Sequence, residues 1–198
     1  MKVFTKKMSQ KNKGFTLIEL LVVMAIFIVI TSVVLFNQNK FSSDTALTNL
    51  TYEIALQIRQ AQVYGILVRQ QTSAFDVGYG IHLKNDSGVI SFLLFSDINN
   101  DGKYVLGDDG NPLSTFSLRE GSTISDVCTT KDSTKVCFSD NPSILMPVDI
   151  VFKRPNPDAS IVDNTRPANN QVDITITSAL KDRSKTITVL NTGQISIK

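Results

Sequence analysis

Histidine is almost absent from this 198-residue chain and occurs once, as His82. Without a second histidine the sequence offers no readable Ser/His/Asp or Cys/His set for nucleophilic catalysis, and no histidine-rich metal site. His82 itself falls in the alternating segment YGIHLK, which is typical of a strand. We therefore expect that the chain is not an enzyme.

Cysteine is scarce as well: Cys128 and Cys137 are the only two, nine positions apart. This spacing is too wide for a C-x-x-C redox or zinc motif. The pair fits one disulfide closing a short loop, provided that the domain lies outside the cytoplasm, where such bonds form. The alternative is a pair of unrelated thiols.

Acidic residues are missing from the first thirteen positions, which carry five lysines. The rest of the chain has 15 basic against 18 acidic residues, although the net charge of the whole is +2. The body of the protein is therefore not a basic nucleic-acid-binding domain by charge alone. The five lysines are instead interpreted together with the segment that follows them.

A long apolar run follows that start. Residues 15–36 contain one formal charge, Glu19, and about 20 apolar residues span a bilayer as a helix. The preceding lysines predict a cytoplasmic N-terminus and a head outside the membrane. A cleavable secretory signal is the alternative, but its apolar core is usually about 7–15 residues long, and no clean small-x-small site follows this run.

Glu19 is the anomaly in that run, because a carboxylate in a membrane helix costs about 2.5–3.5 kcal/mol at the centre and less near an end. One explanation is a helix-end glutamate that reaches the lipid headgroups. Its neighbours indicate another.

The segment KGFTLIELLVVMAI resembles the processing and methylation motif of type IV pilin-like proteins. The resemblance implies that residues 1–14 are a leader, cut between Gly14 and Phe15 by a prepilin peptidase that then methylates the Phe15 amine. It also implies that the Glu19 carboxylate attracts the N-terminal amine of a neighbouring subunit, where low dielectric strengthens the attraction. The implied partners are this peptidase, other pilin or pseudopilin subunits and an inner-membrane assembly platform.

One helix is predicted from residue 15 to about residue 66, with a membrane half over 15–36 and an amphipathic half over 37–66. Many major pilins have a proline near the outer membrane edge, but this chain has Asn and Ser at 37–44, so we expect the helix to fray or bend there. Polar residues such as Gln62 lie mostly off the apolar stripe, which comprises Leu47, Leu50, Ile54, Ile58 and Ala61.

Residues 70–198 change to a period of two and predict a β-rich head, with the segment 154–171 mostly loop. A long helix followed by antiparallel strands is an α+β arrangement, the pilin fold, in which the sheet covers the helix stripe. The order of elements resembles the H-type minor pseudopilins of type II secretion and related minor type IV pilins. The resemblance implies a structural subunit, anchored by one span in the inner membrane and then built into a filament.

An acidic segment follows the second predicted strand. Asp97, Asn99, Asp101 and Asp108 fit the D-x-[DN]-x-[DN]-G-x5-[DE] spacing of a calcium-binding loop, with aspartate at the last position. The flanks look like strands rather than helices. The expectations are a possible calcium ion in the 97–108 loop, or a solvated turn that binds nothing tightly.

A second function class is a binding module that presents its sheet or loops to DNA or a surface. Lys181, Arg183 and Lys185 form a basic hairpin tip that could meet phosphate, or a solvated turn.

Overall fold

The computed structural model describes residues 14–67, 77–86, 89–116, 118, 122–140 and 146–198. The predicted leader, residues 1–14, lies outside this part of the chain except for Gly14. The chain divides into two units, Met1–Phe41 and Ser42–Lys198.

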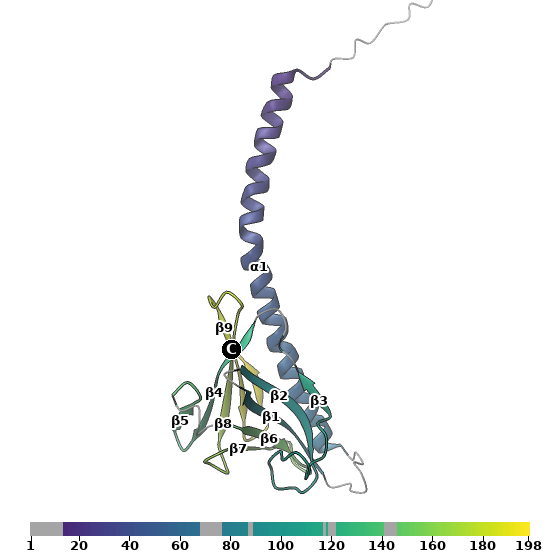
Figure 1. The fold of residues 1–198 in the computed structure, drawn as a ribbon, viewed down its shortest axis with the longest axis vertical. Helices are drawn as coiled ribbons and strands as arrows, with labels where there is room; N and C mark the ends of the chain where they lie inside the picture. The colour runs from purple at the N-terminus through teal and green to yellow at the C-terminus, as the bar shows by residue number, and fades with distance from the viewer. Residues whose placement is uncertain (1–13, 68–76, 87–88, 117, 119–121, 141–145) are drawn as a thin grey trace, which may run out of the picture. The chain divides into compact units, whose positions relative to one another are not determined.

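One helix, α1 (Leu17–Ile66), belongs to both units (Figure 1). Its bounds agree with the prediction to within two residues. Residues 37–44, predicted to fray or bend, are assigned to the helix throughout. A helix that has already nucleated gains one hydrogen bond for each residue added, and this gain outweighs the weak propensities of Asn and Ser.

All other regular elements of the described chain are antiparallel strands, so the α+β prediction is confirmed (Figure 1). The first sheet has the strand order β3-β2-β1-β6-β7, and the second has β10-β9-β8-β4-β5. The strands are β1 (Gly78–Asp86), β2 (Val89–Asp97), β3 (Ser114–Phe116), β4 (Thr123–Lys131), β5 (Thr134–Cys137), β6 (Val148–Phe152), β7 (Ala159–Asp163), β8 (Gln171–Thr177), β9 (Ser184–Leu190) and β10 (Ile195–Ile197).

The described part of the head forms two five-stranded sheets, where the prediction spoke of a single sheet. The segment 154–171 is mostly loop, as predicted, but it also contains strand β7, which was not predicted. Strand β7 pairs along its whole length with β6, where Ile150 lies opposite Ile161. This long-range pairing places buried apolar side chains inside a stretch whose prolines and asparagines indicate a loop.

The core lies between residues 42–66 of the helix and the two sheets. The predicted stripe is confirmed: four of its members are buried and Leu50 is partly buried. The first sheet adds residues such as Leu83 and Phe92, and the second adds Ile174 and Val189. Burying this common face on both sheets holds the head together through the hydrophobic effect.

Gln62 and Gly65 fix the last turns of the helix against the head. Gln62 is buried, contrary to expectation, and its amide nitrogen donates to the carbonyl oxygens of Pro157 (3.0 Å) and Gly193 (2.9 Å). At Gly65 a Cβ atom would lie 2.2 Å from the carbonyl oxygen of Phe152, so only glycine allows the helix to approach β6 this closely.

The other face of the first sheet carries a smaller cluster of Leu93, Phe95 and Val151. Tyr104, from the loop between β2 and β3, packs on this cluster. The acidic segment found in the sequence is therefore part of a loop that folds over the outer face of the sheet.

Candidate functional site

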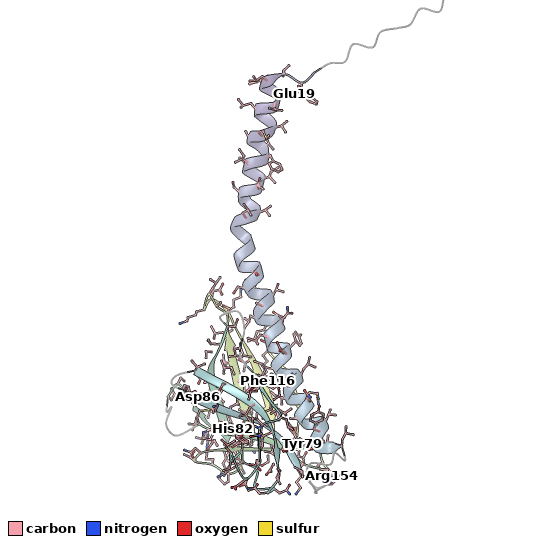
Figure 2. The ribbon with its side chains drawn as sticks, turned by 45° about the vertical axis from the view of Figure 1, so that its right-hand side comes forward. Glu19, Tyr79, His82, Asp86, Phe116 and Arg154 are labelled. Atoms are coloured by element: carbon pink, nitrogen blue, oxygen red, sulfur yellow. A yellow bond between two sulfur atoms is a disulfide. The ribbon has the colours of Figure 1, made fainter. Side chains whose placement is uncertain are left out.

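The start of α1 is capped by Thr16. The backbone nitrogen of Glu19 donates to the Thr16 hydroxyl at 3.3 Å, and the nitrogen of Leu20 donates to the Thr16 carbonyl at 3.2 Å. Thr16 is therefore the N-cap residue, and Glu19 occupies the third helical position, as in a T-x-x-E capping sequence. An acid in the first turn is also favoured by the helix dipole. Figure 2 shows Glu19 at this end of the helix.

Gly14 and Phe15 precede this cap. Both residues are exposed, and a Cβ atom built on Gly14 would meet nothing within 4 Å. The packing of the described chain thus gives no reason for glycine at position 14. The two residues at the predicted cut are open to another molecule.

The helix beyond Glu19 is apolar over most of its surface up to Leu35, with Thr31 and Ser32 as its polar residues. Leu17–Leu35 has a mean hydropathy of 2.9, is long enough to cross a membrane, and has none of its residues buried within the chain. A signal sequence near an N-terminus meets the same criteria of length and composition. Apolar surface of this extent must be covered by lipid or by other protein chains.

The acidic segment closes into a tight loop around Asp97. This residue ends β2 and is 2% exposed, and its two carboxylate oxygens accept the backbone nitrogens of Asp101 (3.1 Å) and Gly102 (3.0 Å). The Asn99 side chain also accepts from the Asp101 nitrogen, at 3.1 Å. Burial raises the pKa of Asp97, and this outweighs the lowering effect of the Gly102 hydrogen bond. The side chains of Asp97 and Asn99 thus meet at the backbone nitrogen of Asp101, and the Asn99 amide nitrogen donates to the Asp101 carboxylate at 3.2 Å.

Asp108, the fourth predicted ligand, is exposed, whereas the adjacent Asp109 is 1% exposed. Asp109 accepts the backbone nitrogens of Ile98 (3.0 Å) and Val105 (2.8 Å), so it joins the two ends of the loop. The loop spacing pointed to position 108, and sequence reasoning missed Asp109. A glycine at position 110 with φ of +71° follows Asp109 directly and was the available signal for a sharp turn there.

Beneath this loop His82 and Asp149 form a buried pair. They are directly opposite each other on β1 and β6, and Nδ1 of His82 lies 2.6 Å from Oδ1 of Asp149. Burial raises the pKa of Asp149, against the lowering effect of the His82 contact. The Tyr104 ring lies 5.0 Å from the His82 ring. His82 is a strand residue, as predicted, and its place in the head is marked in Figure 2.

The basic hairpin tip is the turn between β8 and β9. Arg183 forms an ion pair of 2.5 Å with Asp44 of α1, Lys181 is exposed, and Lys185 is half-buried. The structure therefore ties one of the three predicted cations to the helix. Elsewhere in the second sheet, Cys128 and Cys137 lie opposite each other on β4 and β5 and are joined by a disulfide.

Part of the chain matches a known protein family. Residues 9–35 match the family described as the prokaryotic N-terminal methylation motif. No curated protein and no solved structure matches the chain significantly. The match covers Gly14, Phe15 and Glu19 and ends at Leu35, where the membrane-length apolar segment also ends. It supports a pilin-like chain of the prepilin type, with processing by a prepilin peptidase and assembly with other pilins.

Proposed function

We propose that the protein is a minor subunit of a type IV pilin-like filament, most similar in kind to the H-type minor pseudopilins of type II secretion. A prepilin peptidase removes residues 1–14, Leu17–Leu35 anchors the chain in the membrane, and the β-rich head stays outside. The observation that carries this proposal is the Gly14–Phe15–Glu19 spacing, with the methylation-motif match over residues 9–35.

The surface of α1 supports assembly through the helix. Beyond the apolar segment, which is exposed throughout, the head half also leaves apolar side chains uncovered: Tyr52 (55% exposed), Leu56 (65%) and Val63 (42%). These residues recur at helical spacing and face away from the buried stripe. Packing against neighbouring subunits would remove this surface from water.

Glu19 gives the assembly its register in this proposal. Cleavage after Gly14 creates a free amine at Phe15, and a membrane carboxylate needs a positively charged partner. The amine of an adjacent subunit supplies that charge. Within a bundle of apolar helices, this attraction is much stronger than in water.

The test is filament incorporation in cells that assemble the cognate filament. Glu19→Ala and Glu19→Gln should both abolish incorporation, and Glu19→Asp should restore part of it. Glu53→Gln, which removes an exposed acid from the head half of the same helix, should leave incorporation unchanged. Normal incorporation of Glu19→Gln would refute the charge-pairing role. Loss of secretion, rather than of pilus extension, on deletion of the gene would assign the subunit to a secretion machine.

We also propose that the loop from Asp97 to Asp109 binds calcium. Support comes from the ligand spacing and from the hydrogen bonds that bring the side chains of Asp97 and Asn99 to the backbone of Asp101. Calcium at about 100 times its Kd would stabilise the head by about 2.7 kcal/mol. Asp101→Asn should remove this calcium-dependent rise in Tm, and Asp140→Asn, an exposed acid after β5, should not. An unchanged Tm of the wild type in millimolar calcium would refute the site.

A further inference from the structure

The turn between β8 and β9 combines an exposed apolar side chain with several cations. Leu180, at the tip, is 55% exposed. Lys181 follows it directly, Arg183 comes after the intervening Asp182, and both cations are exposed. Lys185 lies two residues beyond Arg183. We call residues 178–185 the basic turn. Basic residues beside an exposed apolar residue are typical of segments that lie in the interface of an anionic membrane.

The basic turn is held in a defined conformation. The Ser178 nitrogen donates to the Arg183 carbonyl, and the Lys181 nitrogen donates to the Ser178 carbonyl, both at 2.9 Å. The one acid of the turn, Asp182, accepts a hydrogen bond from the Ser178 hydroxyl at 2.7 Å. The turn therefore presents Leu180 outward on a closed frame.

The positive charge extends from the basic turn to the helix. Arg183 pairs with Asp44 at 2.5 Å, and an open depression of about 480 Å³ lies beside this pair. Lys185 and Lys198 also line the depression. The basic turn and the depression together hold four cationic side chains, against the carboxylates of Asp44 and Asp182 and the terminal carboxylate of Lys198, so the surface keeps a net positive charge.

The sequence limits how far this surface lies from the membrane. Asp44 follows Leu35, the last residue of the apolar segment, by nine positions. Nine residues span about 14 Å as a helix and at most about 30 Å when fully extended. The Arg183–Asp44 ion pair therefore links the basic turn to a helix residue that the chain can hold no more than about 30 Å from the end of the apolar segment.

We propose that the basic turn is a membrane contact, in which Leu180 enters the interface and Lys181, Arg183 and Lys185 bind the phosphates of anionic phospholipids. This inference rests on the membrane anchoring in the proposed function. It gives the head a fixed docking position while the subunit waits in the membrane before assembly. Near an anionic surface each lysine strengthens binding roughly fivefold, so Lys181 and Lys185 together contribute up to roughly 25-fold.

Nucleic acid is the competing phosphate source, and the features of the turn disfavour it. Residues 178–185 contain no aromatic side chain on which bases could stack. An exposed leucine at the tip adds nothing to phosphate binding by itself, whereas it gains free energy by leaving water for lipid.

The chain contains no tryptophan, so Leu180→Trp introduces a single fluorescent reporter. The matched control is Leu106→Trp, at another exposed position (72%), on the loop between β2 and β3. That loop begins at Asp97, opposite Gly78, and the adjacent Tyr79 packs on Tyr64. Tyr64 lies twenty residues beyond Asp44 along α1, a helical distance of about 30 Å, so the control reports from the other end of the head.

The experiment uses the full chain in vesicles of phosphatidylcholine, with or without phosphatidylglycerol, that contain a headgroup-spin-labelled lipid. The Leu180→Trp emission should be quenched more than the Leu106→Trp emission, and the excess should grow with phosphatidylglycerol. Adding Lys181→Gln and Lys185→Gln to Leu180→Trp should remove this increase of the excess quenching with phosphatidylglycerol. Lys84→Gln with Lys131→Gln, a charge-matched pair on the other hairpins, should not.

Equal quenching at the two positions, in chains that stay in the vesicles after alkaline washing, would overturn this inference and leave the proposed function intact. Loss of the chain on washing would overturn both. A Leu180→Trp emission that responds to added duplex DNA but not to phosphatidylglycerol would overturn the inference and assign the turn to nucleic acid. Each variant should unfold at the wild-type temperature, because positions 180 and 106 are exposed.

Discussion

The hydroxyl of Thr16 accepts a hydrogen bond from the backbone nitrogen of Glu19 at 3.3 Å, and the two residues together form the start of the helix. Glu19 therefore has a place within its own chain, in the first helical turn, as well as its proposed role between subunits. A substitution at Glu19 affects both, because it changes the charge at the helix N-terminus. A substitution at Thr16 changes the helix start and leaves the Glu19 charge in place, so it separates the two roles.

Thr16→Ala should weaken the start of α1 and leave the Glu19 charge in place. Loss of an N-cap hydroxyl costs about 1 kcal/mol, so the backbone amides of Glu19 and Leu20, which donate to Thr16, should exchange with deuterium roughly fivefold faster. Thr16→Ser, which retains the hydroxyl, should exchange like the wild type. Equal exchange in Thr16→Ala would show that the cap seen here does not stabilise the helix.

Gly193→Ala should destabilise the head strongly. The backbone φ of Gly193 is +80°, and a Cβ atom there would lie 1.9 Å from the Pro157 carbonyl oxygen. The same change at Gly107, where φ is +109° but no atom lies within 4 Å, tests the backbone cost alone. That backbone cost is about 1–2 kcal/mol. In chemical denaturation, Gly193→Ala should lower the free energy of unfolding by more than this. Equal losses for the two variants would contradict the close packing of the β9–β10 turn against Pro157.

Asp163→Asn should destabilise the contact between the two sheets. The Asp163 side chain, from β7, accepts a hydrogen bond from the Thr129 hydroxyl of β4 at 2.8 Å and pairs with Arg166 at 3.2 Å. Breaking a buried charged network costs about 3 kcal/mol, measured at neutral pH as a lower free energy of unfolding.

The same variant has a predicted pH dependence. Burial raises the pKa of Asp163, but the hydrogen bonds from Thr129, Thr165 and Arg166 outweigh it, so the pKa falls below its ordinary value of 3.8. The charged form is therefore favoured by folding, and its stabilisation is present above about pH 3.8 and is lost as the pH falls through the folded-state pKa. The stability difference between wild type and Asp163→Asn should shrink below pH 3.8, and a constant difference would contradict this account.

Cys128→Ser together with Cys137→Ser should lower the stability of the second sheet. The disulfide closes a loop over nine positions, for which loss of the cross-link costs roughly 2–3 kcal/mol. Reducing agent should lower the Tm of the wild type as far as the double substitution does. It should leave the Tm of the double variant unchanged. A reductant effect on the double variant would show that the cross-link is not its cause.

The sequence predicts the elements that depend on local pattern. The stripe from Leu47 to Ala61 identifies the buried helix face because a single 3.6-residue period relates its members. The change to a period of two after residue 70 likewise predicts that the head is built from strands.

Features that depend on residues far away in the chain could not be predicted from the sequence. Strand β7 is defined by its pairing with β6, and no local property marks Ile161 as core. Gln62 looks like a surface residue until the Pro157 and Gly193 carbonyls are brought to it. Asp108 and Asp109 look alike in the sequence, but in the folded loop it is Asp109 whose carboxylate accepts the Ile98 nitrogen. Each contact is set by tertiary structure.

The N-terminus of the mature chain tests the central claim most directly. The full chain should be expressed with a prepilin peptidase, with an inactive peptidase and a Gly14→Val variant as controls, and its mass measured intact. We predict a chain that begins at Phe15 and carries one methyl group on its amine, and that appears in neither control. A chain that retains Met1–Gly14 with the active peptidase, or that is cut elsewhere, would contradict the account.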